Sequence, residues 1–82
     1  MDVSIIYVNY YTKALILDSI RSVKKYTVNI SYEIIIVDNN TEDLSEILDL
    51  YYDVKILKLP VNVGFGIANN KGAEIARGKY IL

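Results

Sequence analysis

The chain has 82 residues, of which 52% are apolar and 23% charged, and its formal net charge is −1. These values are typical of one small globular domain, and the mixed charges exclude the strongly basic surface that nucleic-acid-binding proteins use. Cysteine and histidine are absent, which excludes thiolate nucleophiles, zinc–thiolate sites and imidazole catalysis, and leaves hard cations such as magnesium or manganese as the metals that the side chains could bind.

Seven elements can be predicted along the chain. Continuous apolar, largely β-branched runs indicate buried strands, and apolar residues that recur every three or four positions indicate helices. In chain order they are a strand at 3–8, a helix at 12–25, a strand at 32–37, a short helix at 44–50, a strand at 54–59, a helix at 66–76 and a strand at 79–82. The strand before Pro60 alternates in polarity and is expected at an edge, whereas the last strand is expected to be central.

Capping residues mark the ends of the predicted helices. Thr12 is a suitable N-cap for the first helix, and either Thr41 or Asp43 is suitable for the second. Gly78 follows the third helix at a position where glycine often ends a helix.

Buried strands that alternate with helices predict a parallel sheet with helices on both faces. Right-handed crossovers then favour a Rossmann-like, three-layer α/β/α domain with a parallel sheet of about four strands. In such sheets ligands bind beyond the carboxyl ends of the strands. Three segments meet there, namely residues 9–12, 38–41 and 60–66.

Polar residues in the first two segments are candidates for ligand binding. The Asp38 carboxylate could accept the N3–H of a uracil or thymine ring, or a ribose hydroxyl, but a loop aspartate can equally accept local backbone N–H groups. Asn9 could pair with a base edge, and one of the two tyrosines that follow, Tyr10 or Tyr11, could stack on that base or close the pocket. A turn-forming asparagine followed by interfacial tyrosines would also explain the pattern, and a receiver-like or flavodoxin-like binding module stays open.

The third segment is a glycine-containing turn that leads into a helix. A helix N-terminus favours an anion such as a diphosphate, and Gly64 could permit close approach of the backbone or simply a tight turn. Asn69 and Asn70 lie one turn further on, where asparagine is a poor helix former. At least one of them is therefore expected to have a partner, either a ligand or a neighbouring loop.

Three segments together resemble the amino-terminal part of inverting family 2 glycosyltransferases of the GT-A fold. They are VSIIYVNYYTKALILDSIRSV, YEIIIVDNNTED and NVGFGIANNKGAEIARGKYIL. The last is similar to the rhamnosyltransferase-like branch, although many family members have an arginine at the position of Asn69. The resemblance implies that residues 1–82 are the nucleotide-sugar-binding part of a glycosyltransferase domain. The nucleotide-binding residues that it implies are Val8, Asn9, Tyr10, Asp38, Asn39, Gly64, Asn69 and Asn70.

The resemblance also implies a reaction, the transfer of a sugar from a UDP- or dTDP-sugar to a hydroxyl acceptor with inversion. The family's D-x-D motif, which holds magnesium or manganese on the donor diphosphate, and its general base are expected beyond Leu82, so no catalytic or metal-binding residue is expected within the chain. We therefore expect an incomplete, inactive domain that could self-associate through its truncated sheet.

A non-catalytic, self-associating remnant is the alternative to an enzyme fragment. No signal peptide or membrane-spanning apolar run is present in the sequence. The expected location is cytoplasmic, where the intact enzyme could lie at the inner face of the membrane and serve polysaccharide biosynthesis.

Overall fold

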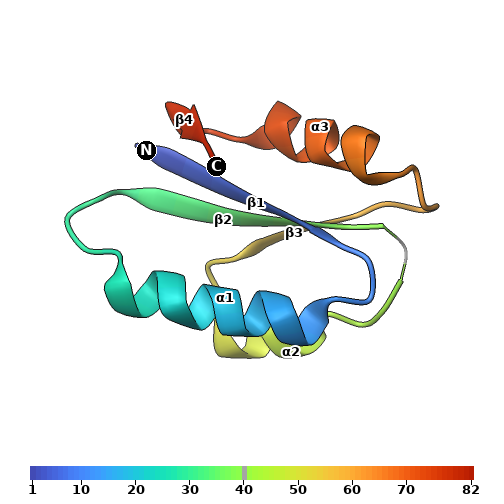
Figure 1. Cartoon of the computed structure of the whole chain (residues 1–82), viewed down its shortest axis with the longest axis horizontal. Helices are drawn as coiled ribbons and strands as arrows, with labels where there is room; N and C mark the ends of the chain where they lie inside the picture. Colours follow the sequence, from blue (N-terminus) through green and yellow to red (C-terminus); the bar gives the residue numbers. More distant parts are fainter. Residues whose placement is uncertain (40) are drawn as a thin grey trace.

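The computed structural model describes residues 1–39 and 41–82. Strands and helices alternate along this part of the chain (Figure 1). The elements are β1 (Val3–Asn9), α1 (Lys13–Tyr26), β2 (Tyr32–Asp38), α2 (Ser45–Leu50), β3 (Lys55–Lys58), α3 (Phe65–Ile75) and β4 (Tyr80–Ile81). Each end lies within one residue of its predicted position, because local patterns of apolar and turn residues determine these boundaries.

The strands form a single parallel sheet in the order β3-β2-β1-β4. Helices α1 and α2 cover one face and α3 covers the other (Figure 1). The predicted three-layer α/β/α fold with about four parallel strands is therefore confirmed. The edge position of β3 is also confirmed. The central position predicted for β4 is wrong for the described sheet, because β4 pairs with β1 alone, Val3 beside Tyr80 and Ser4 beside Ile81.

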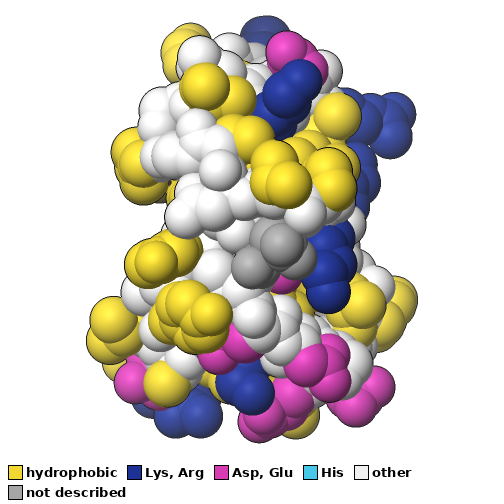
Figure 2. All heavy atoms as spheres, turned by 90° about the vertical axis from the view of Figure 1, so that its right-hand side faces the viewer, with side chains coloured by type: hydrophobic (Ala, Val, Ile, Leu, Met, Phe, Trp, Pro, Cys, Tyr) yellow, Lys and Arg dark blue, Asp and Glu magenta, His cyan; other side chains and the backbone are white. Residues whose placement is uncertain are grey.

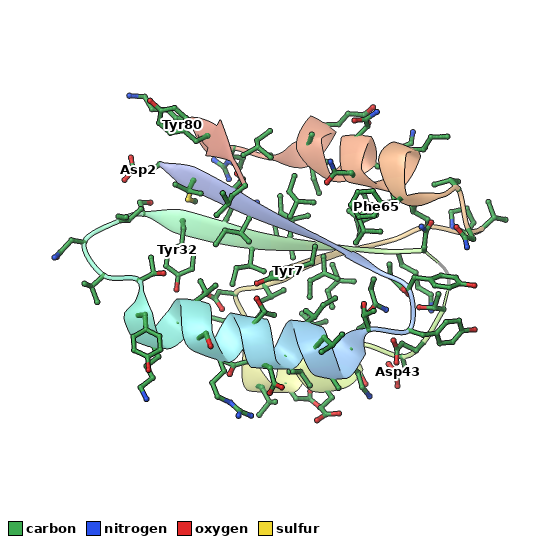
Figure 3. All side chains as sticks on the ribbon, in the orientation of Figure 1. Asp2, Tyr7, Tyr32, Asp43, Phe65 and Tyr80 are labelled. Atoms are coloured by element: carbon green, nitrogen blue, oxygen red, sulfur yellow. The ribbon has the colours of Figure 1, made fainter. Side chains whose placement is uncertain are left out.

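The core lies on both faces of β2. Successive side chains of a strand point to opposite faces, so Ile34 and Ile36 pack towards α1 and α2, whereas Ile35 and Val37 pack towards α3. Tyr7 of β1 also points towards α1, where its hydroxyl lies 2.6 Å from that of Ser19 (Figure 3). Burial on both faces explains why the predicted second strand is an uninterrupted apolar run.

Gly78 lies against β1 and does not cap α3. The helix ends at Ile75, and its C-cap is Ala76 in an extended conformation, so the predicted C-cap role of Gly78 is wrong. A Cβ atom added at Gly78 would lie 2.5 Å from the backbone nitrogen of Ser4. The Gly78 N–H donates a 2.8 Å hydrogen bond to the Ser4 hydroxyl. Glycine is therefore needed here because two backbones approach closely.

A buried carboxylate joins the strands at the amino end of the sheet. Glu33 Oε2 accepts hydrogen bonds from the Ser4 hydroxyl and the Arg77 N–H, each 2.5 Å long, and Oε1 accepts a 2.9 Å bond from Lys55 Nζ. Burial by itself would raise the pKa of Glu33, but these hydrogen bonds outweigh it and lower the pKa to about 2. The network connects β1, β2, β3 and the segment before β4, so its role is structural.

Candidate functional site

The loops after β1, β2 and β3 meet at the carboxyl edge of the sheet, which Figure 2 shows face on. Asn9 holds the first of these loops in place. Its side chain is fully buried, and its Oδ1 accepts hydrogen bonds from the N–H and the hydroxyl of Thr12 at 3.1 and 3.0 Å. Its Nδ2 lies 3.2 Å from Asp38 Oδ1 and 3.1 Å from Thr41 Oγ1. These bonds favour the turn-forming role that the sequence left open for Asn9 over a direct contact with a base.

Side chains from neighbouring loops satisfy the starts of α1 and α2. Thr12 occupies the predicted N-cap position of α1, but its side chain makes no capping hydrogen bond. Instead, Glu42 Oε2 accepts the N–H of Lys13 at 3.2 Å. At α2 the N-cap residue is Leu44, which makes no side-chain capping bond, so the N-cap predicted at Thr41 or Asp43 is wrong. Asp43 lies one residue earlier and accepts the Ser45 N–H at 2.9 Å, and this bond lowers the pKa of Asp43.

A cavity of about 460 Å³ lies at this edge beside the first turn of α3. It is lined by Val8, Tyr10, Thr12, Asn39, Asn62, Gly64 and Phe65. Four of these residues, Val8, Tyr10, Asn39 and Gly64, were predicted from the sequence as nucleotide-binding, and the structure brings them together from the end of β1 and the loops after β1, β2 and β3. The cavity has no acidic residue in its described lining.

Hydrogen bonds between loops shape the wall of this cavity. Asn39 Oδ1 accepts the Val63 N–H at 3.0 Å, and Asn39 Nδ2 donates to the Gly64 carbonyl at 3.4 Å. Asn62 Oδ1 accepts the Gly64 N–H at 2.9 Å. Gly64 has φ +85°, a left-handed conformation that glycine adopts without strain. Sequence reasoning did not select Asn62 or Phe65, although an asparagine two residues before a glycine is a signal for such a turn.

Helix α3 begins at the cavity with its N-terminus uncapped. Gly64, the N-cap residue, has no side chain to offer, and the first turn has no acidic residue. The first N–H groups of a helix have no partner within the helix, and together with the helix dipole they favour an anion. The start of α3, where Figure 3 labels Phe65, is therefore suited to a phosphate group.

Asp38 lies on the other face of the sheet from this cavity. Strand alternation directs Asp38 and Asn9 towards α1 and α2, but Val8 towards α3. Asp38 is only 1% exposed and lines a smaller hollow of about 200 Å³. That hollow is lined by Asp38, Glu42, Asp43, Leu44, Ser45, Leu48, Ile56 and Lys58. Figure 3 labels Asp43 and Phe65 on opposite sides of the sheet, which separates the two hollows.

One oxygen of the Asp38 carboxylate accepts hydrogen bonds from its neighbours, and the other has no partner among the described residues. Its Oδ1 accepts hydrogen bonds from Thr41 Oγ1 at 2.9 Å and from Asn9 Nδ2 at 3.2 Å. Its Oδ2 is buried and has no hydrogen-bond partner among the described residues. A buried acceptor without a partner is costly, so Oδ2 is suited to an N–H or O–H donor of a ligand.

The structure does not bring Asn69 and Asn70 to the cavity. Asn69 is half-buried and Asn70 is exposed on α3, and neither side chain lines either hollow. Within residues 1–39 and 41–82 neither makes a side-chain hydrogen bond, so the structure does not identify the partner expected from the sequence. The reason is geometric: α3 turns its small residues Ala68 and Gly72 towards the sheet.

Acidic side chains gather over α1 and α2 on the face shown in Figure 2. The described residues nevertheless form no group of three or more metal-binding side chains that could hold an ion. None of the helices in that same part of the chain has both the length and the apolar character needed to cross a bilayer.

The chain is an α/β domain with a parallel sheet, helices on both faces and a cavity beyond the carboxyl ends of its strands. That edge is where α/β domains of this kind usually bind ligands. The family model described as Glycosyl transferase family 2 matches residues 3–82. The chain therefore belongs to glycosyl transferase family 2, as the sequence predicted.

Solved structures of TarS from S. aureus are similar to this chain. TarS 1-349 matches with a TM-score of 0.86 and 25% identity, over 100% of this chain and 26% of the TarS chain. TarS 1-349 in complex with UDP-GlcNAc matches with a TM-score of 0.85 and 25% identity, over 100% and 25% of the two chains. This chain thus spans about a quarter of the length of those structures. Among curated proteins, no sequence matches it significantly.

Proposed function

We propose that this chain forms the nucleotide-binding part of a glycosyltransferase whose donor is a nucleotide-diphosphate sugar. Membership of glycosyl transferase family 2 and the similarity to TarS, which has been crystallised with UDP-GlcNAc, support this function. The observation that carries the proposal is the cavity at the carboxyl edge of the sheet, lined by Val8, Tyr10, Asn39 and Gly64. Its volume of about 460 Å³ lies in the range usual for small-molecule sites.

Charge favours the larger cavity over the smaller hollow as the diphosphate site. Three carboxylate residues, Asp38, Glu42 and Asp43, line the smaller hollow and would repel an anion. The larger cavity combines a described lining without acidic residues and the uncapped start of α3. We therefore place the diphosphate at α3 and the base near Tyr10, a residue that is 56% exposed and whose ring could stack on a base.

Several finer features of the enzyme are part of the same proposal. The whole enzyme would use UDP- or dTDP-sugars, transfer to a hydroxyl acceptor with inversion, and act in polysaccharide biosynthesis in the cytoplasm. A magnesium or manganese ion would stabilise the departing diphosphate, but the described residues offer no cluster to hold it, so we assign it no role here. We expect the chain alone to lack transferase activity. Association of copies through β4, whose side chains are exposed, stays a prediction that light scattering can test.

Nucleotide titration tests this proposal. Isothermal calorimetry with UDP, dTDP and flavin mononucleotide should reveal weak binding of the pyrimidine nucleotides. Tyr10→Ala should weaken that binding about tenfold, since stacking of a base on an aromatic ring contributes about 1–3 kcal/mol. Tyr52→Ala is the matched control, because Tyr52 is 92% exposed and lies outside both hollows. Binding of flavin without either pyrimidine nucleotide would contradict the proposal.

Asp38→Asn tests whether the base reaches the unpartnered oxygen. If Asp38 Oδ2 accepts the N3–H of the pyrimidine, the amide that replaces it cannot do so, and affinity for UDP should fall about tenfold or more. The bonds accepted by Oδ1 can be retained, so the thermal midpoint should change little. Unchanged affinity in Asp38→Asn, together with weaker binding in Tyr10→Ala, would restrict the base to the larger cavity.

A further inference from the structure

Tyr11 has an unusual backbone conformation beside the cavity. Its φ is +56°, in the left-handed region, where a bulky side chain is rare because Cβ crowds the following carbonyl. The residues on either side of the Tyr10–Tyr11 pair, Asn9 and Thr12, are held in place by hydrogen bonds. The Asn9 carbonyl accepts the Asn39 N–H at 3.1 Å, and Asn9 Oδ1 accepts the Thr12 N–H at 3.1 Å. The two residues between Asn9 and Thr12 therefore span a tight reversal, and Tyr11 bears its strain.

Burial does not explain why a tyrosine occupies this position. Tyr11 is 66% exposed, and it lines neither of the two hollows. Its ring does meet that of Tyr10, with centroids 5.2 Å apart and planes at 77°, which is an edge-to-face contact. Tyr10 is the partner that lines the cavity. Strained residues that persist near a site are reasonable candidates for a functional role.

We propose that Tyr11 is a positioning residue, which holds the ring of Tyr10 at the mouth of the cavity in the orientation that stacks on the base of a nucleotide. The inference rests on the proposed nucleotide-binding function. Without the Tyr11 ring, an exposed Tyr10 would sample other rotamers, and binding would have to order it. A ring that is already held in place avoids that entropic cost, so affinity rises without a new contact to the ligand.

Substitutions of Tyr11 by residues that adopt a positive φ easily remove the aromatic ring without adding backbone strain. They therefore distinguish an effect on nucleotide affinity from an effect on the stability of the fold. Tyr11→Asn should weaken UDP binding about threefold to tenfold, the range expected from one edge-to-face pair. The same change should raise the thermal midpoint by about 4 °C, because asparagine tolerates the left-handed region better than tyrosine. Tyr11→Gly removes the ring and the strain as well and should weaken binding equally. Tyr11→Phe keeps the ring and should retain the affinity of the parent chain.

Two further variants show whether Tyr11 acts through Tyr10. Asn29→Gly is the matched backbone control, because Asn29 also has a positive φ, +62°, and lies in the loop before β2 at the other end of the sheet. The affinity of the Asn29→Gly variant for UDP should equal that of the parent chain. In a double-mutant cycle, Tyr11→Asn should have no further effect once Tyr10 is alanine. An equal effect in both backgrounds would mean that Tyr11 contacts the ligand itself, and would overturn a positioning role.

The outcomes distinguish this inference from the proposed function. If the parent chain binds UDP and Tyr10→Ala weakens binding while Tyr11→Asn does not, the positioning role is wrong and the nucleotide site stands. If the parent chain binds no pyrimidine nucleotide by calorimetry, both are wrong. Weaker binding in Tyr11→Asn and Tyr11→Gly, with normal affinity in Tyr11→Phe, supports the inference.

Discussion

Gly78→Ala is expected to destabilise the fold by about 3 kcal/mol, at the upper end of the range for overpacking substitutions. The added methyl group would lie 2.5 Å from the Ser4 nitrogen and 2.6 Å from the Val3 carbonyl carbon. Both are backbone atoms of β1, so no side chain can move aside to make room. The clash would push the segment before β4 away from β1 and weaken the bond from the Gly78 N–H to the Ser4 hydroxyl.

Urea denaturation at neutral pH measures this effect, with Gly66→Ala as the matched control. A Cβ added at Gly66 meets nothing within 4 Å, and this residue lies within α3. Because alanine is the better helix former, Gly66→Ala should leave stability unchanged or raise it by up to about 1 kcal/mol. Equal effects at the two glycines would argue against a specific close approach at Gly78.

Glu33→Gln is expected to have the second large effect, a loss of about 3 kcal/mol at pH 7. The glutamine amide would place a donor among the Ser4 hydroxyl, the Arg77 N–H and the Lys55 ammonium, where the carboxylate now accepts. It would also leave Lys55 without the partner of its ion pair. Glu74→Gln, a change at an exposed residue of α3, should alter stability by less than about 0.5 kcal/mol.

The effect of Glu33 should depend on pH in a defined direction. Its pKa is lowered from 4.5 to about 2 in the folded chain. The unfolded chain therefore takes up a proton first as the solution is acidified, and the stabilisation is complete above pH 4.5 and is lost between there and about pH 2. Urea denaturation at pH 7, 4.5 and 2.5 should show the parent chain approaching Glu33→Gln at the lowest pH. A difference that stays constant across this range would contradict the role of the ionised carboxylate.

Much of the fold and part of the site could be predicted from local sequence patterns. Strand and helix boundaries depend on neighbouring residues, which is why apolar runs and helical spacing predicted them within one residue. Parallel pairing followed from the buried character of β2, and parallel strands bring their carboxyl ends to one edge. The segments 9–12, 38–41 and 60–66 could therefore be predicted to gather there. Tyr10, Asn39 and Gly64 of these segments line one cavity together with Val8, which only the family resemblance indicated.

The remaining features depend on contacts between residues far apart in the chain. Gly78 contacts Ser4, which lies 74 positions away in the sequence, and Arg77 contacts Glu33, which lies 44 positions away. The residues that neighbour Gly78 and Glu33 in the sequence therefore indicate neither the close approach at Gly78 nor the buried network of Glu33. Asn9 has its amide occupied by Thr12 and by the loop after β2, which only the assembled loops define. The packing of the sheet also places Asp38 and Val8 in different hollows, because neighbouring strands present alternate side chains to opposite layers.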